Sequence, residues 1–196
     1  KYKVSSLKAR IFKKPGIGTK SWLPLASKLS VFEQNKNWIK IKTLFDNYKG
    51  FIKNSKYIEK FTPNYKVSSL KARIFKKPGI RTNNWLPLAS RLSAFKQNKN
   101  YIKIEKNKWI KKADIKKVNH KENNFIKIFK KFLNVKYVWG GKTFQGIDCS
   151  ALLQIFFYYN NSFYPRDTKD QIKYTKKDSK KRKFKKGDII FWKGHV

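Results

Sequence analysis

The chain contains a single cysteine, Cys149, whose type and position could support nucleophilic catalysis. Cys149 follows a glycine-rich loop and stands directly after Asp148, a residue type that often caps the N-terminus of a helix. At a helix N-terminus, unpaired backbone N–H groups and the positive end of the helix dipole favour the thiolate, which is the nucleophilic form of cysteine. A small apolar side chain in a core is the alternative role that this position leaves open.

A general base for this cysteine would have to come from another element, and His195 is the candidate. The run from Phe184 to Trp192 is rich in aromatic and β-branched residues and is entered through a Gly187-Asp188 turn signal, which predicts a strand. Cysteine and histidine partners in nucleophilic sites are distant in sequence and close in space. We therefore expect a strand to deliver the His195 imidazole to Cys149.

Three helices are expected to position this pair. The uninterrupted apolar stretch from Ala151 to Tyr159 predicts a buried helix that carries the cysteine in its first turn. Apolar residues at helical spacing over residues 125–132 predict an amphipathic helix that packs beneath it. After Pro165, either Asp167 or Thr168 can cap a third helix that runs to about residue 175.

Four ordered motifs carry a resemblance to a known family: YVWGG, GIDCSALLQ, YPRDTKDQ and KKGDIIFWKGHV. They are similar to the NlpC-type cysteine peptidases of bacterial cell-wall metabolism. The resemblance implies a papain-like α+β domain over residues 120–196. It further implies hydrolysis of the γ-D-glutamyl bond to a diamino acid in peptidoglycan stem peptides, as a dipeptidyl-peptidase on peptides with a free N-terminal L-Ala, in wall turnover or recycling.

The resemblance also implies roles for individual residues. Cys149 would be the nucleophile, His195 the general base, and Tyr137 a support for the oxyanion. The residues that the resemblance places around the substrate are Asp148, Ser150, Asp167 and Thr168. Asp167 would bind the free amine, because a protonated amine needs an acidic partner. The third catalytic polar residue of the family follows the GHV strand, so the domain is expected to be incomplete at its C-terminal end.

The first 118 residues contain an internal repeat. The stretch from Tyr2 to Ile41 recurs at 65–104, with an offset of 63 residues and seven mismatches among 40 positions. The two copies are therefore expected to fold alike. Short alternating runs separated by Pro-Gly and Asn-rich turns predict the β-strands of a small barrel, and Phe51 and Trp109 are expected at matching positions after a five-residue difference in length.

Each copy resembles the bacterial SH3-like domains that precede NlpC-type catalytic domains. The expected fold class is therefore multidomain, with two small all-β SH3-like barrels at 1–61 and 64–118 before the α+β domain at 120–196. In relatives with this layout, the SH3-like domains pack on the catalytic domain and help to select stem peptides. Residues 61–64 and 118–124 read as linkers, with His120 exposed in the second, and the lysine-rich stretch 176–186 as a surface loop.

The net charge of +38 raises the question of a nucleic-acid partner. Only six of the 49 basic residues are Arg, and the lysines are spread over every segment. Base readout and bidentate phosphate contacts favour Arg, so no specific nucleic-acid partner is expected. A hydrophobic content of 40% and an aromatic content of 16% are sufficient for packed cores and exclude a disordered chain.

The resemblance and the composition together define the expected partners. The partners are peptidoglycan stem peptides or muropeptides, the protein acts as a monomer, and no metal or organic cofactor is needed. No apolar run approaches transmembrane length, and the compartment, envelope or cytoplasm of a bacterium, stays open. The alternatives are a non-catalytic wall-binding protein with a degenerate peptidase domain, and a cationic nucleic-acid binder.

Overall fold

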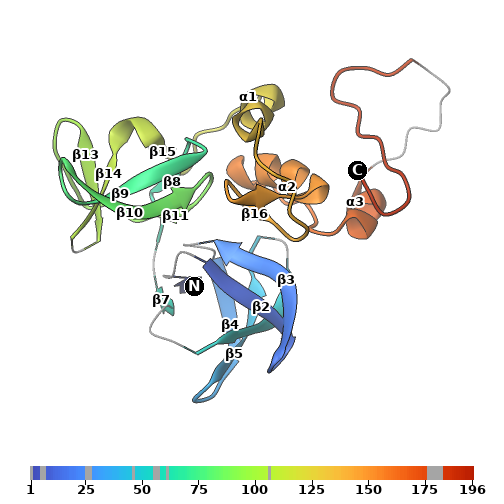
Figure 1. The fold of residues 1–196 in the computed structure, drawn as a ribbon, viewed down its shortest axis with the longest axis horizontal. Helices are drawn as coiled ribbons and strands as arrows, with labels where there is room; N and C mark the ends of the chain where they lie inside the picture. The colour runs from blue at the N-terminus through green and yellow to red at the C-terminus, as the bar shows by residue number, and fades with distance from the viewer. Residues whose placement is uncertain are drawn as a thin grey trace.

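The computed structural model describes residues 2–4, 8–24, 28–45, 47–54, 58–60, 62–105, 107–175 and 183–196. This part of the chain is mostly β with few helices (Figure 1). It comprises a first β unit (strands β1 to β7), a second β unit (strands β8 to β15) and a helical part that begins at Phe125. Most of the expected 176–186 loop, residues 176–182, lies outside the described residues.

The first β unit is one antiparallel sheet. Its strands are β1 (Tyr2–Val4), β2 (Lys8–Lys14), β3 (Ile17–Pro24), β4 (Lys28–Gln34), β5 (Trp38–Thr43), β6 (Lys49–Lys53) and β7 (Ile58–Lys60). They pair in the order β3-β2-β6-β5-β4-β1-β7. Alternate residues face an apolar core that contains Ile11, Leu29, Ile39, Ile41 and Ile52, as the period of two in these runs predicts.

The second β unit has the same succession of strands in two sheets. They are β8 (Tyr65–Val67), β9 (Lys71–Lys77), β10 (Ile80–Pro87), β11 (Arg91–Leu92), β12 (Lys96–Gln97), β13 (Tyr101–Glu105), β14 (Lys108–Lys111) and β15 (Ile115–Lys117), with a 3-10 turn η1 (Lys112–Asp114). The sheet orders are β10-β9-β14-β13-β12 and β11-β8-β15. Buried Val, Leu and Ile side chains fill the space between the two sheets.

One expected correspondence between the two copies is seen in the strand register. Phe51 pairs with Phe12 across β6 and β2, and Trp109 pairs with Phe75 across β14 and β9, so Phe51 and Trp109 occupy the matching positions that the sequence predicts. The predicted closed barrels are not seen. Among the described residues, the two end strands of the first sheet, β3 and β7, do not pair with each other.

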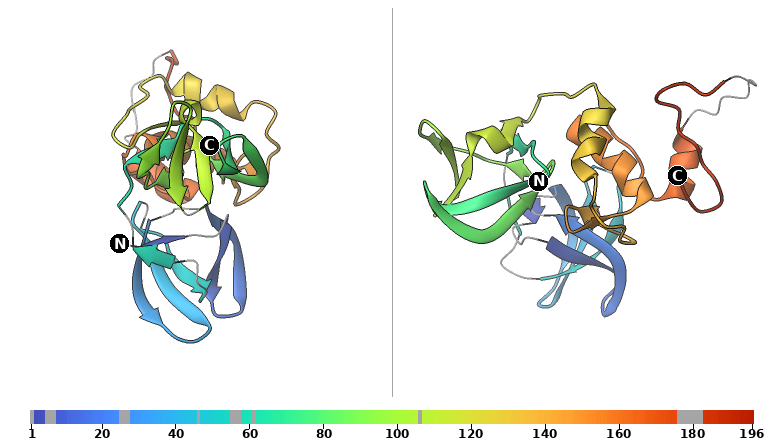
Figure 2. Two further views of the ribbon diagram at one scale, coloured as in Figure 1. Left: turned by 90° about the vertical axis from the view of Figure 1, so that its left-hand side faces the viewer. Right: turned by 45° about the horizontal axis from the view of Figure 1, so that its top comes forward.

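The helical part contains α1 (Phe125–Phe129), which continues as the 3-10 turn η2 (Lys130–Phe132), then the hairpin β16 (Lys142–Thr143) and β17 (Gly146–Ile147), and the helices α2 (Cys149–Tyr159) and α3 (Thr168–Tyr174). The predicted packing of α1 against α2 is confirmed, because the rings of Phe125 and Phe129 lie 6.4 and 6.3 Å from the ring of Phe156. In both views of Figure 2 the first β unit lies below the second β unit and the helical part.

The predicted strand from Phe184 to Trp192 is wrong. The turn before it is present, since the Asp188 N–H donates to the Lys185 carbonyl, but residues 188–191 form no strand. Trp192 makes one isolated bridge with His195. A strand is stabilised by ladder partners, and among the described residues no strand pairs with this run, whose Ile190 and Trp192 are 53% and 57% exposed. No helix in the described ranges is both long and apolar enough to cross a membrane.

Candidate active site

Helix α2 begins at the cysteine because Asp148 caps it. The Asp148 carboxylate accepts a hydrogen bond from the Ala151 N–H at 2.8 Å and satisfies one of the donors that a helix N-terminus leaves unpaired. Cys149 is therefore the first helical residue, as predicted, and its side chain is partly exposed. The remaining unpaired N–H groups and the helix dipole lie next to the sulfur, where they favour negative charge.

The loop before Cys149 can follow its path only with glycine at two positions. A Cβ atom on Gly141 would lie 2.5 Å from the Gly146 carbonyl oxygen, and a Cβ on Gly146 would lie 2.3 Å from the Val138 side chain. This close approach lets the Gly140 N–H reach the second carboxylate oxygen of Asp148 at 2.8 Å. The loop and the helix start are thus tied to the same carboxylate.

A buried arginine, Arg166, completes this arrangement, and the sequence did not predict it. Arg166 donates to both carboxylate oxygens of Asp148, at 3.1 and 2.6 Å, and to the Ser150 hydroxyl at 2.7 Å. All three side chains are buried. One signal could have found it, because Arg166 is one of only six arginines in a chain that otherwise uses lysine, and a bidentate contact with a carboxylate needs the guanidinium fork.

This network changes how Asp148 and Ser150 contribute to the site. Asp148 lines the groove described below, but its two oxygens are occupied by Arg166 and by backbone N–H groups. The Ser150 hydroxyl donates to Asp148 and accepts from Arg166 inside the protein, and Ser150 does not line the groove. Both side chains therefore help to position Cys149, and the Ser150 hydroxyl does not contact the groove.

Helix α3 is fastened to the cysteine helix by Gln171, whose side chain is fully buried. Its amide nitrogen donates to the carbonyls of Ser150 and Pro165, both at 2.9 Å. Asp167 is the N-cap residue of α3, as predicted, yet it makes no side-chain capping hydrogen bond. Asp167 and Thr168 are half-buried and lie outside the groove lining.

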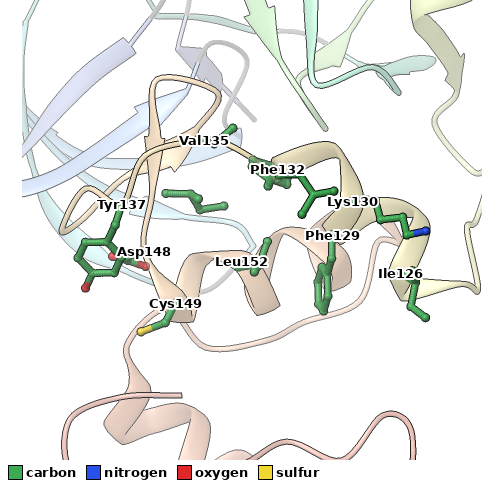
Figure 3. A pocket seen from close by; sticks show the side chains of 11 residues that line it. Ile126, Phe129, Lys130, Phe132, Val135, Tyr137, Asp148, Cys149 and Leu152 are labelled. Carbon is green, nitrogen blue, oxygen red and sulfur yellow. The ribbon is translucent and has the colours of Figure 1, made fainter.

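An apolar groove of about 400 Å³ opens beside the sulfur. Its walls are Ile126, Phe129, Lys130, Phe132, Leu133, Val135, Tyr137, Ile147, Asp148, Cys149 and Leu152. Figure 3 shows Cys149, Tyr137 and Asp148 at one end and Lys130 and Ile126 at the other. A ligand in this groove would have one end beside the thiol.

Tyr137 lies at the sulfur end because its backbone pairs with the last strand of the hairpin. It forms a parallel bridge with Ile147, and the neighbouring Val138 N–H donates to the Ile147 carbonyl at 3.2 Å. Desolvation, followed by the proximity of Cys149 and Asp148, raises the pKa of Tyr137 above its usual value of 10.0. Its hydroxyl therefore stays protonated at neutral pH and can donate a hydrogen bond.

His195 does not lie with the cysteine in this structure. Its ring stacks on that of Trp192, with centroids 5.9 Å apart and an interplanar angle of 25°, and it is exposed. It is not among the residues that line the groove. His120 is exposed as predicted, and its ring lies 6.3 Å from that of Tyr159. Within the described residues, no cluster of three or more His, Cys, Asp or Glu side chains is placed to hold a metal ion.

The far end of α2 is held by two buried cations of the second β unit. The Lys66 ammonium is fully buried, donates to the carbonyls of Tyr159 and His120, and lies 4.2 Å from the centre of the Tyr159 ring. Arg91 donates to the Tyr158 carbonyl at 2.6 Å. Cations are favourable at a helix C-terminus, where carbonyls are unpaired and the dipole is negative.

Burial disfavours the charged form of Lys66. Desolvation, and then the positive charges of Arg91 and Lys121, lower the pKa of Lys66 to about 8. Apolar contacts support the same junction, because Leu88 and Ala89 of the second β unit are buried in one cluster with residues of α1 and α2. The second β unit and the cysteine helix therefore share a core.

Residues 134–196 match the NlpC/P60 family. A curated relative, Dipeptidyl-peptidase 6 of Lysinibacillus sphaericus, is 32% identical over 73 residues, which make up 37% of this chain and 27% of that protein. The chain thus spans about a quarter of the length of the curated relative it matches.

Two solved structures share the fold. An NlpC/P60 family protein from Bacillus cereus ATCC 10987 superposes with a TM-score of 0.72 at 14% identity, covering 87% of this chain and 76% of that one. An NlpC/P60 endopeptidase from Photobacterium damselae subsp. piscicida superposes with a TM-score of 0.58 at 17% identity, covering 85% and 44%. The first superposition covers more of the chain than the helical part alone, so the likeness in fold extends into the β units.

Proposed function

We propose, from the premise that residues 134–196 form a domain of the NlpC/P60 family, that this protein is a cysteine peptidase with Cys149 as its nucleophile. The observation that carries the proposal is the place of Cys149. The only cysteine of the chain is the first residue of α2, beside unpaired N–H groups, and it lines an apolar groove together with Tyr137. A structural cysteine needs neither feature.

The substrate we propose is a peptidoglycan stem peptide, cleaved between γ-D-Glu and the diamino acid. Two observations support this choice: the resemblance of the four motifs to NlpC-type peptidases, and the name of the Lysinibacillus relative, a dipeptidyl-peptidase. A dipeptidyl-peptidase needs an acidic group for the free amine of its substrate. Asp167 is our candidate, because its carboxylate is not used to cap α3.

The proposed reaction is acyl transfer to sulfur. The Cys149 thiolate adds to the γ-carbonyl carbon of D-Glu, and the negative charge moves to the carbonyl oxygen. Backbone N–H groups at the start of α2 and the protonated Tyr137 hydroxyl supply hydrogen bonds to that oxygen. Collapse of the tetrahedral species expels the diamino acid, whose amine takes a proton, and water then hydrolyses the thioester.

We propose that the His195 imidazole accepts the thiol proton of Cys149 and later donates it to the departing amine. To act as general base, the imidazole has to leave Trp192 and come within hydrogen-bond reach of the sulfur. That reach is about 3 Å between a nitrogen and an oxygen atom, and it is longer when one of the two atoms is sulfur. Catalytic hydrogen bonds often tighten only when the substrate is bound. The proposal therefore predicts that a bound stem peptide shifts the His195 imidazole resonances, whereas a peptide with an α-linked L-Glu does not.

Cys149→Ala tests the proposal directly. We expect the chain to release diaminopimelate from L-Ala-γ-D-Glu-diaminopimelate and the variant to lose that activity by at least about a thousandfold, because alanine supplies no sulfur to form the thioester. Release would be followed by chromatography. Circular dichroism would establish that the variant is folded, and His195→Asn should lower the rate while leaving the thiol in place. Equal rates for Cys149→Ala and the unaltered chain would overturn the assignment.

A second candidate function is favoured by the placement of His195 away from the groove. If the imidazole cannot reach the sulfur, the protein is a wall-binding protein without peptidase activity. Iodoacetamide labelling of Cys149 as a function of pH separates the two. A free thiol ionises at a pH of about 8.5. A labelling rate that already reaches its plateau well below that pH supports the peptidase, and a rate that rises with pH as for a free thiol supports the binding protein.

A further inference from the structure

One row of side chains crosses neighbouring strands on the face of each β unit that is opposite its core. In the first β unit the row contains Glu33, Lys40, Phe51 and Phe12, which pair directly across β4, β5, β6 and β2. In the second β unit the same row contains Lys96, Lys103, Trp109 and Phe75. We call these the first and second outer rows, and their backbones match position by position.

Each outer row ends in the same aromatic arrangement. Trp38 packs edge-on against Phe12 with ring centres 4.8 Å apart, and Tyr101 packs edge-on against Phe75 at 5.0 Å. The edge-on packing is therefore common to the two rows, although Tyr101 replaces Trp38 and Trp109 replaces Phe51. The charged residues are the second difference between the rows.

Within the repeat, the charged residues differ by one reversal, and just beyond it Glu105 of β13 replaces Lys42 of β5. Among the seven mismatches between the copies, Glu33 against Lys96 is the only exchange of a negative for a positive side chain. In the first outer row, Glu33 forms an ion pair with Lys40 at 2.7 Å. In the second, Lys96 stands directly opposite Lys103, and like charges at directly opposed positions destabilise a sheet. The second outer row thus has two lysines at directly opposed positions where its sister has an ion pair, and the acidic residue of β13, Glu105, pairs with Lys108 at 2.6 Å.

A third lysine joins this pair. Lys111 is opposite Tyr101 in the sheet, and its ammonium lies 6.0 Å from the centre of the Phe75 ring. The Lys103 ammonium lies 5.9 Å from the centres of both the Trp109 and the Phe95 rings. The ammonium groups of Lys103 and Lys111 therefore lie near aromatic rings, and Lys96 is opposite Lys103 in the sheet. An anionic ligand would relieve the repulsion between these cations.

We propose that the second outer row binds an anionic polysaccharide. Ammonium groups are point charges that suit carboxylates or phosphates, and the half-buried rings of Tyr101 and Trp109 offer apolar contact to the C–H groups of sugar rings. The first outer row provides a comparison site within the same chain. Its shallow pocket of about 220 Å³ is lined by Glu33, Trp38, Lys40 and Phe51 among others, and the Glu33 carboxylate repels an anion there.

A polysaccharide fits this row better than a nucleic acid. Sequence-independent binding of single strands uses open ring faces on which bases stack. Here Phe75 is 3% exposed, and the rings of Tyr101 and Phe75 lie edge-on at 74°. The row also has lysines in place of the arginines that stack on bases and contact phosphates in two places. The proposal concerns residues that the peptidase reaction does not use.

The test uses the full chain and calorimetric titration with a defined oligogalacturonate, with neutral dextran and oligo-dT as comparison ligands. Lys96→Glu gives the second row the charges of the first, an arrangement that the sister copy shows to be compatible with this fold. Lys169→Glu, at an exposed position in α3, makes the same change in net charge far from the row and is the matched control.

We expect Lys96→Glu to weaken oligogalacturonate binding by at least about tenfold, since the local charge changes by two units within a few ångströms of the ligand. Lys169→Glu should change it by less than about twofold. The reciprocal Glu33→Lys should raise the number of bound oligogalacturonates per chain from one to two. Equal losses for the two Lys→Glu variants, equal affinity for dextran, or a Lys96-dependent affinity for oligo-dT that exceeds that for oligogalacturonate would each overturn the proposal.

Discussion

The two β units form a natural comparison, because their sequences are nearly identical and their surroundings are not. Both units run through the same strands in the same order. In the first unit β4 is one continuous strand of seven residues, whereas in the second its counterpart is split into β11 and β12. A single interruption at residues 93–95 therefore converts one sheet into two.

A residue that precedes the second copy contacts the interruption. The Asn64 side chain donates to the Ala94 carbonyl and accepts from the Ala94 N–H, both at 2.8 Å, and so takes the place of a neighbouring strand. The residue that precedes the first copy in the sequence is Lys1, and a lysine side chain contains no hydrogen-bond acceptor. The corresponding strands thus pair differently where the Asn64 amide takes up the backbone groups of Ala94, a position at which the first copy has Val31.

The two units also contact the helical part differently. The second unit uses residues inside the repeat, Lys66 and Arg91, to hold the C-terminal carbonyls of α2. The first unit uses Phe45, whose ring lies 4.5 Å from that of Tyr158 and which belongs to the stretch where the first copy is five residues longer. The two copies of a duplicated module can therefore contact the same helix through different residues, one inside the repeat and one in a stretch where their lengths differ.

The largest effect is expected from Lys66→Met. The substitution keeps the length of the side chain but leaves the carbonyls of Tyr159 and His120 without their donor, which should lower the free energy of unfolding by about 3 kcal/mol. Urea denaturation measures it. The control is Lys116→Met in β15, whose side chain is exposed, so we expect a loss of less than about 1 kcal/mol. Equal losses would mean that the contacts of Lys66 with the end of α2 add nothing to stability.

Asn64→Ala tests the cause of the split strand. Loss of two hydrogen bonds to Ala94 should cost about 1.5 kcal/mol and speed amide hydrogen exchange at that residue. Asn83→Ala, which removes an exposed amide from the same unit, should be nearly neutral. If exchange at Ala94 were unchanged, the side chain of Asn64 would not be what replaces the strand.

Phe45→Ala tests the contact made by the insertion. Removal of the edge-on contact with Tyr158 should cost about 1 kcal/mol in urea denaturation. Phe95→Ala removes a ring of the same size that is 66% exposed, and we expect a smaller loss from it. A loss at Phe95 as large as at Phe45 would show that the insertion adds nothing to docking.

The last prediction concerns the pH dependence of stability at Lys66. The folded pKa of Lys66 is about 8, against an ordinary value of 10.5, so between these values the unfolded chain binds more protons at this site. Stability contributed by the site therefore rises as pH increases from 8 towards 10.5 and falls again as pH drops through 8. The unfolding free energy of the unaltered chain relative to Lys66→Met should increase over that interval. A difference in unfolding free energy that does not change with pH would contradict a folded pKa of about 8 for Lys66.

Local features of the site were predictable from sequence to the extent that they depend on nearby residues. Asp148 before an apolar run predicts the start of α2 at Cys149, and the Gly141 and Gly146 positions predict a tight loop. Arg166 was missed because an ion pair between residues 18 positions apart has no local pattern. The strand expected before His195 was wrong because strand formation depends on a pairing partner, which a propensity pattern does not contain.

By itself, the sequence determined the duplication, the strands of both copies, the capped cysteine helix and the resemblance of residues 120–196 to one peptidase family. Only the tertiary structure decided that Lys66 and Arg91 close the far end of that helix, that Arg166 secures its start, and that His195 rests on Trp192. The reason is physical. Caps, turns and strand periodicity arise within a few residues, whereas a buried charge is stable only when distant segments bring it a partner.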